Sequence, residues 1–224
     1  MNSLSSDVRL AALLARLHED SEAQMPALMQ FFEKHGGDSL TGTEAEIAAG
    51  RPFWCDKLVA IDPVKAQFCY RLCRALGARR VVEAGTSYGV STLYLAAAVR
   101  DNGGGVVIGT EYEPEKAKAA RANFAASGLA DQIELLEGDL RETLKTLAGP
   151  IDFMLLDIWT PMVRPAIERV APHLRRGAVV IADNTTLYRE AYADYFAFLG
   201  DPANGFTTQT LPFEGGLEMS VKLG

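Results

Sequence analysis

Acidic residues stand at the ends of five successive apolar runs, where their side chains could bind a ligand. They are Glu83, Glu111, Asp139, Asp157 and Asp183. A single acid in this position usually caps the helix that follows. Five acids at one edge of a sheet would repel one another, and some would be forced to protonate without compensation. A ligand rich in hydroxyl and ammonium groups, or a divalent cation, would provide that compensation.

Two neighbouring runs carry residues that could bind a metal ion. Asp157 ends the run IDFMLLD, and Asp183 and Asn184 end the run GAVVIADN. Two carboxylates and an amide carbonyl are hard oxygen donors, which suit Mg²⁺, Ca²⁺ or Mn²⁺ better than zinc or copper. The alternative is that Asp183 and Asn184 form a turn after the strand, as these residue types often do.

The first apolar run leads into a glycine-rich segment, VVEAGTSYGVST at residues 81–92. Gly85 and Gly89 let the backbone turn sharply and approach a ligand, and Ser91 falls in the first turn of the next helix. The spacing differs from the GxGxxG of dinucleotide binders. Glu111, which ends the following run, can accept both hydroxyls of a ribose, at about 1.5–3 kcal/mol for each charged hydrogen bond. These features predict an adenosine-containing cofactor, with NAD still possible.

Strand and helix signals alternate from residue 63 onward, which is typical of a doubly wound α/β fold. The expected strands are apolar throughout, as parallel strands buried on both faces must be; they span residues 79–85, 105–111, 133–139, 151–157 and 177–184. The expected helices span residues 63–77, 89–101, 114–128, 140–149, 162–177 and 187–200.

The C-terminal segment breaks this alternation. Residues 206–213 and 217–224 have strand character, and Glu214-Gly215-Gly216 lies between them. Two glycines between strands favour a tight antiparallel hairpin. We therefore expect a mostly parallel, seven-stranded sheet that ends in a hairpin. This topology is that of class I methyltransferases, and it is not the usual ending of a nicotinamide-binding Rossmann domain.

The N-terminal segment is expected to be helical. VRLAALLARLHED has leucines at helical spacing, and MPALMQFFEKHGG ends on a pair of glycines that stop a helix. No proline- or serine-rich linker follows. We therefore expect one domain over residues 1–224, in which residues 1–57 form a helical cap and residues 58–224 form a cofactor-binding α/β core.

Composition narrows the class of protein. The net charge of −7 and the pI near 5.1 argue against a nucleic-acid binder, which needs a basic surface. The apolar runs are too short for a membrane span, and the N-terminus does not resemble a signal peptide. Cys55, Cys69 and Cys73 are an odd number and favour reduced thiols. A cytoplasmic protein with no nucleic-acid or membrane partner is expected.

Residues from about 58 to 224 resemble the catechol O-methyltransferase-like family, which includes the caffeoyl-coenzyme A type and small bacterial relatives. The resemblance is carried by the stretches DPVKAQ (62–67), VVEAGTSYGVST (81–92), GTEYEPEKAKAA (109–120), LLDIW (155–159) and ADN (182–184). It implies an S-adenosylmethionine-dependent O-methyltransferase that uses Mg²⁺ or a similar cation. The acceptor would be a small aromatic molecule with adjacent oxygens. The leucine-rich N-terminal helix makes a homodimer the expected assembly.

The resemblance also implies roles for individual residues. The cofactor-binding residues would be Ile61, Glu83, Gly85, Ser91, Glu111, Tyr112, Asp139, Leu140, Asp157 and Trp159. Among them, Ser91 would bind the methionine carboxylate, Glu111 the ribose, and Trp159 would pack on the adenine. Ordinary core packing is the alternative for Trp159. Asp157, Asp183 and Asn184 would be the metal ligands, and Asp157 would also be catalytic.

The sequence departs from the family pattern beside Asp157. Family members usually carry a lysine three residues after this aspartate, where this chain has Thr160; Ile158 replaces a frequent histidine. Threonine cannot act as a general base at neutral pH. Either the metal alone acidifies the acceptor, or another base replaces the lysine, or the acceptor is not a catechol.

Several residues and functions therefore stay open at this stage. Candidate replacement bases are Lys57, Lys65 and His35. Phe53-Trp54 would form either a lid over the acceptor or a buried joint between cap and core, and residues 214–216 could line the acceptor site. A metal-independent methyltransferase and a non-catalytic S-adenosylmethionine-binding protein are the alternative functions.

Overall fold

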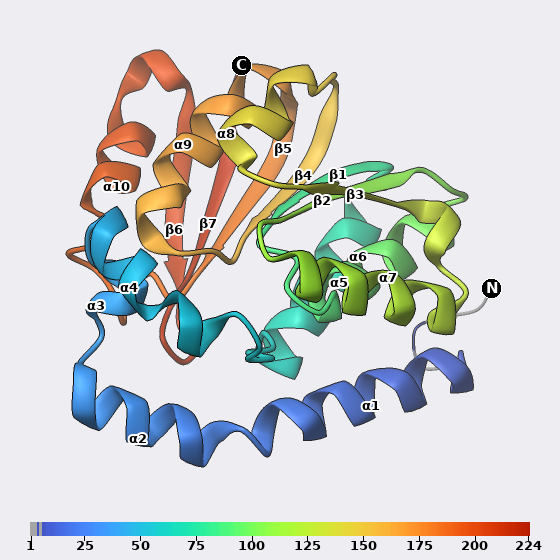
Figure 1. The fold of residues 1–224 in the computed structure, drawn as a ribbon. Coiled ribbons are helices and arrows are strands. Elements are labelled where there is room, and N and C mark those ends of the chain that lie inside the picture. Colours follow the sequence, from blue (N-terminus) through green and yellow to red (C-terminus); the bar gives the residue numbers. More distant parts are fainter. Residues whose placement is uncertain (1–3, 5) are drawn as a thin grey trace.

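The chain folds around one seven-stranded sheet with the order β3-β2-β1-β4-β5-β7-β6 (Figure 1). The structure is a computed structural model that describes residue 4 and residues 6–224. The strands are β1 Arg80–Ala84, β2 Val106–Glu111, β3 Ile133–Glu137, β4 Ile151–Leu156, β5 Leu174–Asp183, β6 Phe206–Leu211 and β7 Leu217–Lys222. Strands β1 to β5 are parallel, and β7 runs antiparallel to both β5 and β6. The predicted fold class is confirmed.

Helices cover both faces of this sheet (Figure 1). The α-helices are α1 Val8–Glu22, α2 Met25–His35, α3 Asp38–Thr41, α4 Glu44–Trp54, α5 Pro63–Ala75, α6 Val90–Asp101, α7 Pro114–Ser127, α8 Leu140–Thr143, α9 Thr160–Val170 and α10 Ala193–Gly200. The short 3₁₀ helices are η1 Ala130–Gln132, η2 Leu144–Thr146, η3 Ala171–His173 and η4 Pro202–Asn204. Helices α5, α6 and α7 bury one apolar core against the sheet, and α8, α9 and α10 bury another on the opposite face. None of the helices in the described part of the chain is long and apolar enough to cross a membrane.

The N-terminal helices are attached to the core through buried side chains. Leu10, Leu13, Leu14 and Leu17 of α1 lie in the same apolar core as α6 and α7. Helix α4 begins at a capping box formed by Thr43 and Glu46, a device that fixes a helix start. In Figure 1, α1 and α2 lie along one edge of the molecule, and α3 and α4 lie between α2 and the sheet.

Three helices differ from the sequence expectation. The helix expected over 140–149 is instead α8, which ends at Thr143, followed by the 3₁₀ helix η2. The helix expected over 162–177 ends at Val170, and Leu174 instead pairs with Ile151 as the start of β5. The helix expected over 187–200 begins only at Ala193. Ahead of this helix, the backbone N–H groups of residues 186 and 187 donate to the carbonyl of Gly215. These backbone groups bind the connection between β6 and β7, which is five residues long and not a two-residue turn.

Asp152 of β4 is expected to make stability sensitive to acid. Its carboxylate accepts hydrogen bonds from the backbone N–H groups of Arg79 (2.8 Å) and Arg80 (2.9 Å) and from Nε of Arg175 (2.6 Å). Burial alone would raise the pKa of Asp152, but these hydrogen bonds outweigh it and hold the pKa below its usual value. A depressed pKa contributes stability above the unfolded value near 4, and this contribution is lost as the pH falls through the folded value.

Asp152→Asn should therefore lower the free energy of unfolding by about 1.5–3 kcal/mol at pH 7. The difference from wild type should shrink below about pH 4, where the unfolded aspartate is protonated. Urea unfolding at pH 7 and pH 3 measures both quantities. Asp131→Asn, at an exposed position, is the matched control and should change neither. An equal loss of stability at both pH values would contradict the depressed pKa of Asp152 as the cause.

Candidate functional site

Three of the five strand-end acids lie level at the carboxyl edge of the sheet. The strand register places Glu111 of β2, Asp157 after β4 and Asp183 of β5 at the same level, with β1 between β2 and β4. Glu83 lies two residues deeper and Asp139 two residues farther out. The expectation of five acids in register is thus corrected to three. The depth of Glu83 follows from β1, which continues to Ala84 before the chain turns at Gly85.

Glu83 is a fully buried acid with one free oxygen. Its Oε2 accepts hydrogen bonds from the hydroxyls of Thr86 (2.9 Å) and Thr92. Its Oε1 is buried and has no hydrogen-bond partner among the described residues. Burial raises the pKa of Glu83, against the lowering effect of hydrogen bonds from Ser91, Thr92 and Thr86. A buried acceptor without a partner is costly, so this atom is suited to a donor from a ligand.

The glycine-rich segment passes very close to the end of β4. Gly85 has φ +98°, and a Cβ there would overlap the carbonyl oxygen of Asp157. Gly89 caps α6 with φ +85°, and a Cβ there would overlap the ring of Phe124. Ser87 also has positive φ, at 49°. The two glycines are thus required by backbone conformation, as expected for a sharp turn, and by close approach to Asp157 and Phe124.

Glu111 joins two loops at the end of β2. Its Oε2 accepts from the N–H of Ser87 (2.6 Å), and its Oε1 accepts from the N–H of Glu113 (2.7 Å). Tyr112 is exposed, and the guanidinium of Arg51 lies 4.6 Å from its ring centroid. Arg51 of α4 also pairs with Glu113 (2.5 Å). The cap therefore reaches the residues expected at the adenosine end of the cofactor.

Asp139 and Leu140 act as structural residues in this structure. The Asp139 carboxylate caps α8 by accepting from the N–H of Arg141 (2.9 Å) and pairs with its guanidinium (2.6 Å). The hydrogen bond from Arg141 holds the pKa of Asp139 below its usual value. Leu140 is buried in the core beneath α9, and Ile61 is buried in the segment before α5. The helix-cap interpretation is therefore correct for Asp139.

Trp159 contacts the cap through an aromatic pair. It stands at the N-cap of α9, is partly exposed, and meets Trp54 edge-to-face at 5.8 Å between ring centroids. Trp54 is buried and its Nε1 donates to the hydroxyl of Ser39 (3.0 Å). Phe53 stacks on Phe31 of α2 at 3.8 Å. Of the two alternatives for Phe53-Trp54, the structure favours the buried joint between cap and core.

Thr160 and the three candidate bases are separated by the fold. Thr160 is buried, and its hydroxyl donates to the carbonyl of Leu40 in the cap (3.5 Å). His35 is exposed on α2, and the ammonium of Lys57 lies over an aromatic ring of the cap. Of the three candidates, Lys65 has its ammonium at the predicted metal ligands.

The predicted metal ligands lie together beside Lys65. Asp183 is buried, and its Oδ1 accepts from Nζ of Lys65 (2.5 Å) and from the N–H of Asn184 (2.7 Å). Asn184 has the left-handed φ of 58°. Burial, followed by the charges of Asp183 and Glu83, raises the pKa of Asp157 to about 8, against the opposing effect of Lys65. A carboxyl with this pKa is mostly protonated and neutral at pH 7, while the carboxylate of Asp183 is paired with the ammonium of Lys65.

The chemistry of these donors fits a hard divalent cation, but one donor is already engaged. In the described part of the chain, no group of three or more His, Cys, Asp or Glu side chains could hold a metal ion. The predicted set has two carboxylates and the amide of Asn184, and a Cβ at Gly215 would lie 2.7 Å from the amide oxygen. The turn at 214–216 thus borders Asn184, and its place in the acceptor site stays a prediction. Lys65 thus already occupies Oδ1 of Asp183.

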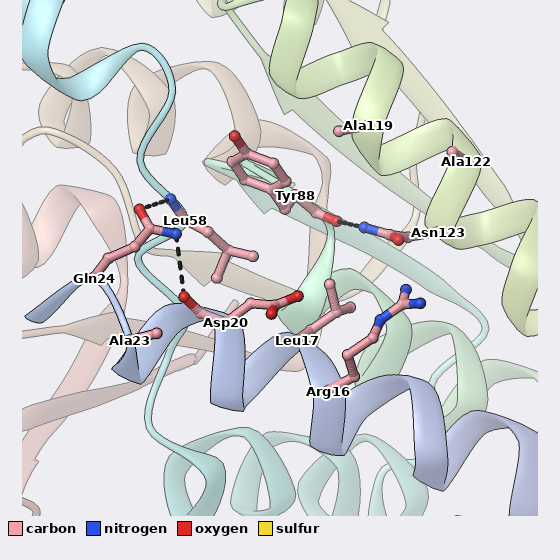
Figure 2. Close-up of a pocket in the computed structure, with 10 residues that line it drawn as sticks. All are labelled: Arg16, Leu17, Asp20, Ala23, Gln24, Leu58, Tyr88, Ala119, Ala122 and Asn123. Atoms are coloured by element: carbon pink, nitrogen blue, oxygen red, sulfur yellow. Dashed lines mark hydrogen bonds between the residues drawn. The ribbon is translucent and has the colours of Figure 1, made fainter.

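A separate groove of about 470 Å³ lies between α1, α7 and the glycine-rich loop (Figure 2). Gln24 accepts from the backbone N–H of Leu58 (3.1 Å) at one end of it, and Asn123 donates to the carbonyl of Tyr88 (3.0 Å) at the other. No motif in the sequence predicted this groove, because it is formed by segments that meet only through the packing of α1.

The sequence matches known methyltransferases in its central part. Residues 82–185 match a family model described as a methyltransferase domain. A catechol O-methyltransferase from Mycobacterium tuberculosis is 37% identical over 127 residues, which cover 56% of this chain and 57% of that protein. A catechol O-methyltransferase from Niastella koreensis is 29% identical over 149 residues, which cover 65% of this chain and 64% of that protein. The matched segments thus span less than two thirds of these relatives.

Solved structures share the fold over most of the chain. The cofactor-bound Rv0187 from MTB has a TM-score of 0.68 at 28% identity, covering 82% of this chain and 92% of that one. The O-methyltransferase from Bacillus cereus in complex with SAH has a TM-score of 0.68 at 22% identity, covering 83% and 91%. The fold is that of class I methyltransferase domains. Within this class, the resemblance to the catechol O-methyltransferase-like family is confirmed.

Proposed function

We propose that this chain is an S-adenosylmethionine-dependent O-methyltransferase that modifies a small aromatic acceptor with adjacent oxygens. The observation that carries the proposal is the free, buried Oε1 of Glu83 beside the turn at Gly85, one strand away from Glu111. The names of the mycobacterial and Niastella relatives support the class of reaction. Residues 1–224 would act as one domain, with residues 1–57 as a cap over the site.

The strand-end residues fit the proposed cofactor. Glu83 offers an acceptor to the methionine end, where Ile61, Gly85 and Ser91 would also bind. Glu111 keeps free lone pairs for the ribose, because a carboxylate has about four acceptor positions and two are in use. Tyr112 and Trp159 would contact the adenine, with Asp139 and Leu140 near its edge in addition to their structural roles, and Asp157 would lie at the corner shared by the cofactor pocket and the metal site. When bound, S-adenosylmethionine supplies an electrophilic methyl group on its sulfonium.

The acceptor site would lie on the side of Asp157 that faces away from the cofactor. Asp157, Asp183 and Asn184 would hold Mg²⁺, or Ca²⁺ or Mn²⁺, whose charge would lower the pKa of an acceptor hydroxyl. The contact between Trp54 and Trp159 and the bond from Thr160 to Leu40 fix the cap against this edge. These contacts would exclude water from the reacting oxygen. Asp157 is the proposed catalytic residue because it would adjoin both the cofactor and the metal ion.

Calorimetry and turnover distinguish the candidate functions. S-adenosylmethionine should bind and NAD should not. A panel of catechols with Mg²⁺ should then give methylated products, and EDTA should abolish turnover. Turnover that survives EDTA would favour the metal-independent methyltransferase. Cofactor binding without turnover on any acceptor would favour the non-catalytic alternative, and binding of NAD alone would reject the proposal.

We also propose that the chain is a cytoplasmic homodimer. Cys55, Cys69 and Cys73 are free thiols, which supports a reducing compartment. Met25 and Met29 are exposed apolar side chains on α2, which supports a contact through the cap. Light scattering on the purified protein should give twice the mass of 24.2 kDa, and a monomer at micromolar concentration would contradict the dimer.

A further inference from the structure

Lys65 is a buried lysine at the start of α5. The carboxylate of Asp62 caps this helix by accepting from the N–H groups of Val64 (2.8 Å) and Lys65 (3.1 Å). This fixed start directs the Lys65 side chain inward, where the residue is only 4% exposed and Nζ lies 2.5 Å from Oδ1 of Asp183. Lysines are almost never this buried unless they are paired.

The ammonium of Lys65 lies at one proposed metal ligand and near the other two. It contacts Asp183 directly and exerts an attractive charge on Asp157. A Cβ built on Gly215 would lie 3.7 Å from Nζ of Lys65 and 2.7 Å from Oδ1 of Asn184, so both atoms border the same small space. The positive charge supplied by the chain itself therefore contacts one of the three proposed ligands, Asp183, and lies near the other two.

An ammonium and a divalent cation cannot use this space together. Mg²⁺ and Mn²⁺ bind carboxylate oxygens at about 2.0–2.2 Å, and the ammonium already holds Oδ1 of Asp183. Two positive charges a few ångströms apart in a poorly solvated space repel strongly. Binding of the ion through this oxygen would therefore displace Lys65 from Asp183.

We propose that Lys65 is a built-in competitor for the divalent cation, so that metal affinity is set by exchange between its ammonium and the ion. The inference rests on the proposed function in that the site is the proposed metal site. It adds a control on metal binding. Without metal, Lys65 holds and neutralises Asp183, and only a sufficient concentration of the ion replaces the ammonium.

Titration of Mn²⁺, followed by electron paramagnetic resonance of the free ion, tests this directly on the purified chain. Lys65→Met should bind Mn²⁺ at least about tenfold more tightly than wild type, which corresponds to 1.4 kcal/mol. Lys118→Met removes an exposed lysine and should match wild type. The double variant Lys65→Met/Asp183→Asn should lose the gain. Equal affinities in wild type and Lys65→Met, or no binding in either, would overturn the proposal.

A measurement on the wild-type chain covers the case in which Lys65→Met fails to fold. With ¹⁵N-labelled lysine, the NMR signal of the buried Lys65 ammonium should shift as Mg²⁺ is added, with the same midpoint as ion binding. Binding of Mg²⁺ that leaves this signal unchanged would overturn the proposal. Neither experiment contains cofactor or acceptor. A chain that lacks methyl transfer but shows the shift would therefore reject the proposed function alone.

Discussion

Gly85→Ala should abolish binding of S-adenosylmethionine and lower the free energy of unfolding by about 2–5 kcal/mol. Two costs add at this position. The left-handed backbone with φ +98° is unfavourable for alanine by about 1–2 kcal/mol. The added Cβ would also overlap the carbonyl oxygen of Asp157, and overpacking of this kind costs about 1–3 kcal/mol. Urea unfolding and calorimetry with S-adenosylmethionine measure the two effects.

Gly104→Ala is the matched control for this prediction. Gly104 has nearly the same φ, +97°, but nothing lies within 4 Å of a Cβ built on it. This variant should lose only the conformational cost of about 1–2 kcal/mol and should bind the cofactor normally. If both variants lost the same stability and both retained binding, the close approach of the glycine loop to β4 would have no role in the site.

Glu111→Ala should weaken binding of S-adenosylmethionine by at least about 100-fold. The carboxylate holds two backbone N–H groups, from Ser87 and Glu113, and is proposed to bind the ribose hydroxyls. Charged hydrogen bonds contribute about 1.5–3 kcal/mol each, so the loss of two reaches this factor. Glu111→Gln keeps one acceptor oxygen, so its affinity for S-adenosylmethionine should lie between those of wild type and Glu111→Ala. Isothermal calorimetry gives the dissociation constants.

Glu137→Ala is the control for the Glu111 variant. Glu137 is the register partner of Glu111 on β3, is partly exposed, and pairs with Arg121. Its removal should leave cofactor affinity within about twofold of wild type, because exposed ion pairs contribute little. Equal losses in the two variants would show that Glu111 acts through general charge and not through contact with the cofactor.

The sheet and the helices packed on it could be predicted from the sequence because local signals mark them. Apolar runs, prolines at helix starts and glycines at helix ends give the alternation of strands and helices. The start of α10 could not be predicted this way. The segment before it instead bonds through residues 186 and 187 to Gly215, which lies far along the chain.

The site was predicted as a set of residue types at one sheet edge, and its contacts were not. Lys65 and Asp183 are 118 residues apart, and nothing local distinguished Lys65 from the other candidate bases. Likewise, Asp139 and Glu111 both follow strands, but only the structure shows that Arg141 engages the first. Such differences arise from tertiary pairing, which spacing along the chain does not encode.

Transfer of a labelled methyl group tests the central claim most directly. The wild-type chain should be incubated with S-adenosylmethionine carrying a ¹³C methyl group, with catechol and with Mg²⁺, and followed by NMR. The account predicts a new methoxy signal on the acceptor that grows as the sulfonium methyl signal declines, and that is lost in Glu111→Ala. A sulfonium signal that stays constant for every vicinal diol tested, or a methoxy signal undiminished in Glu111→Ala, would contradict it.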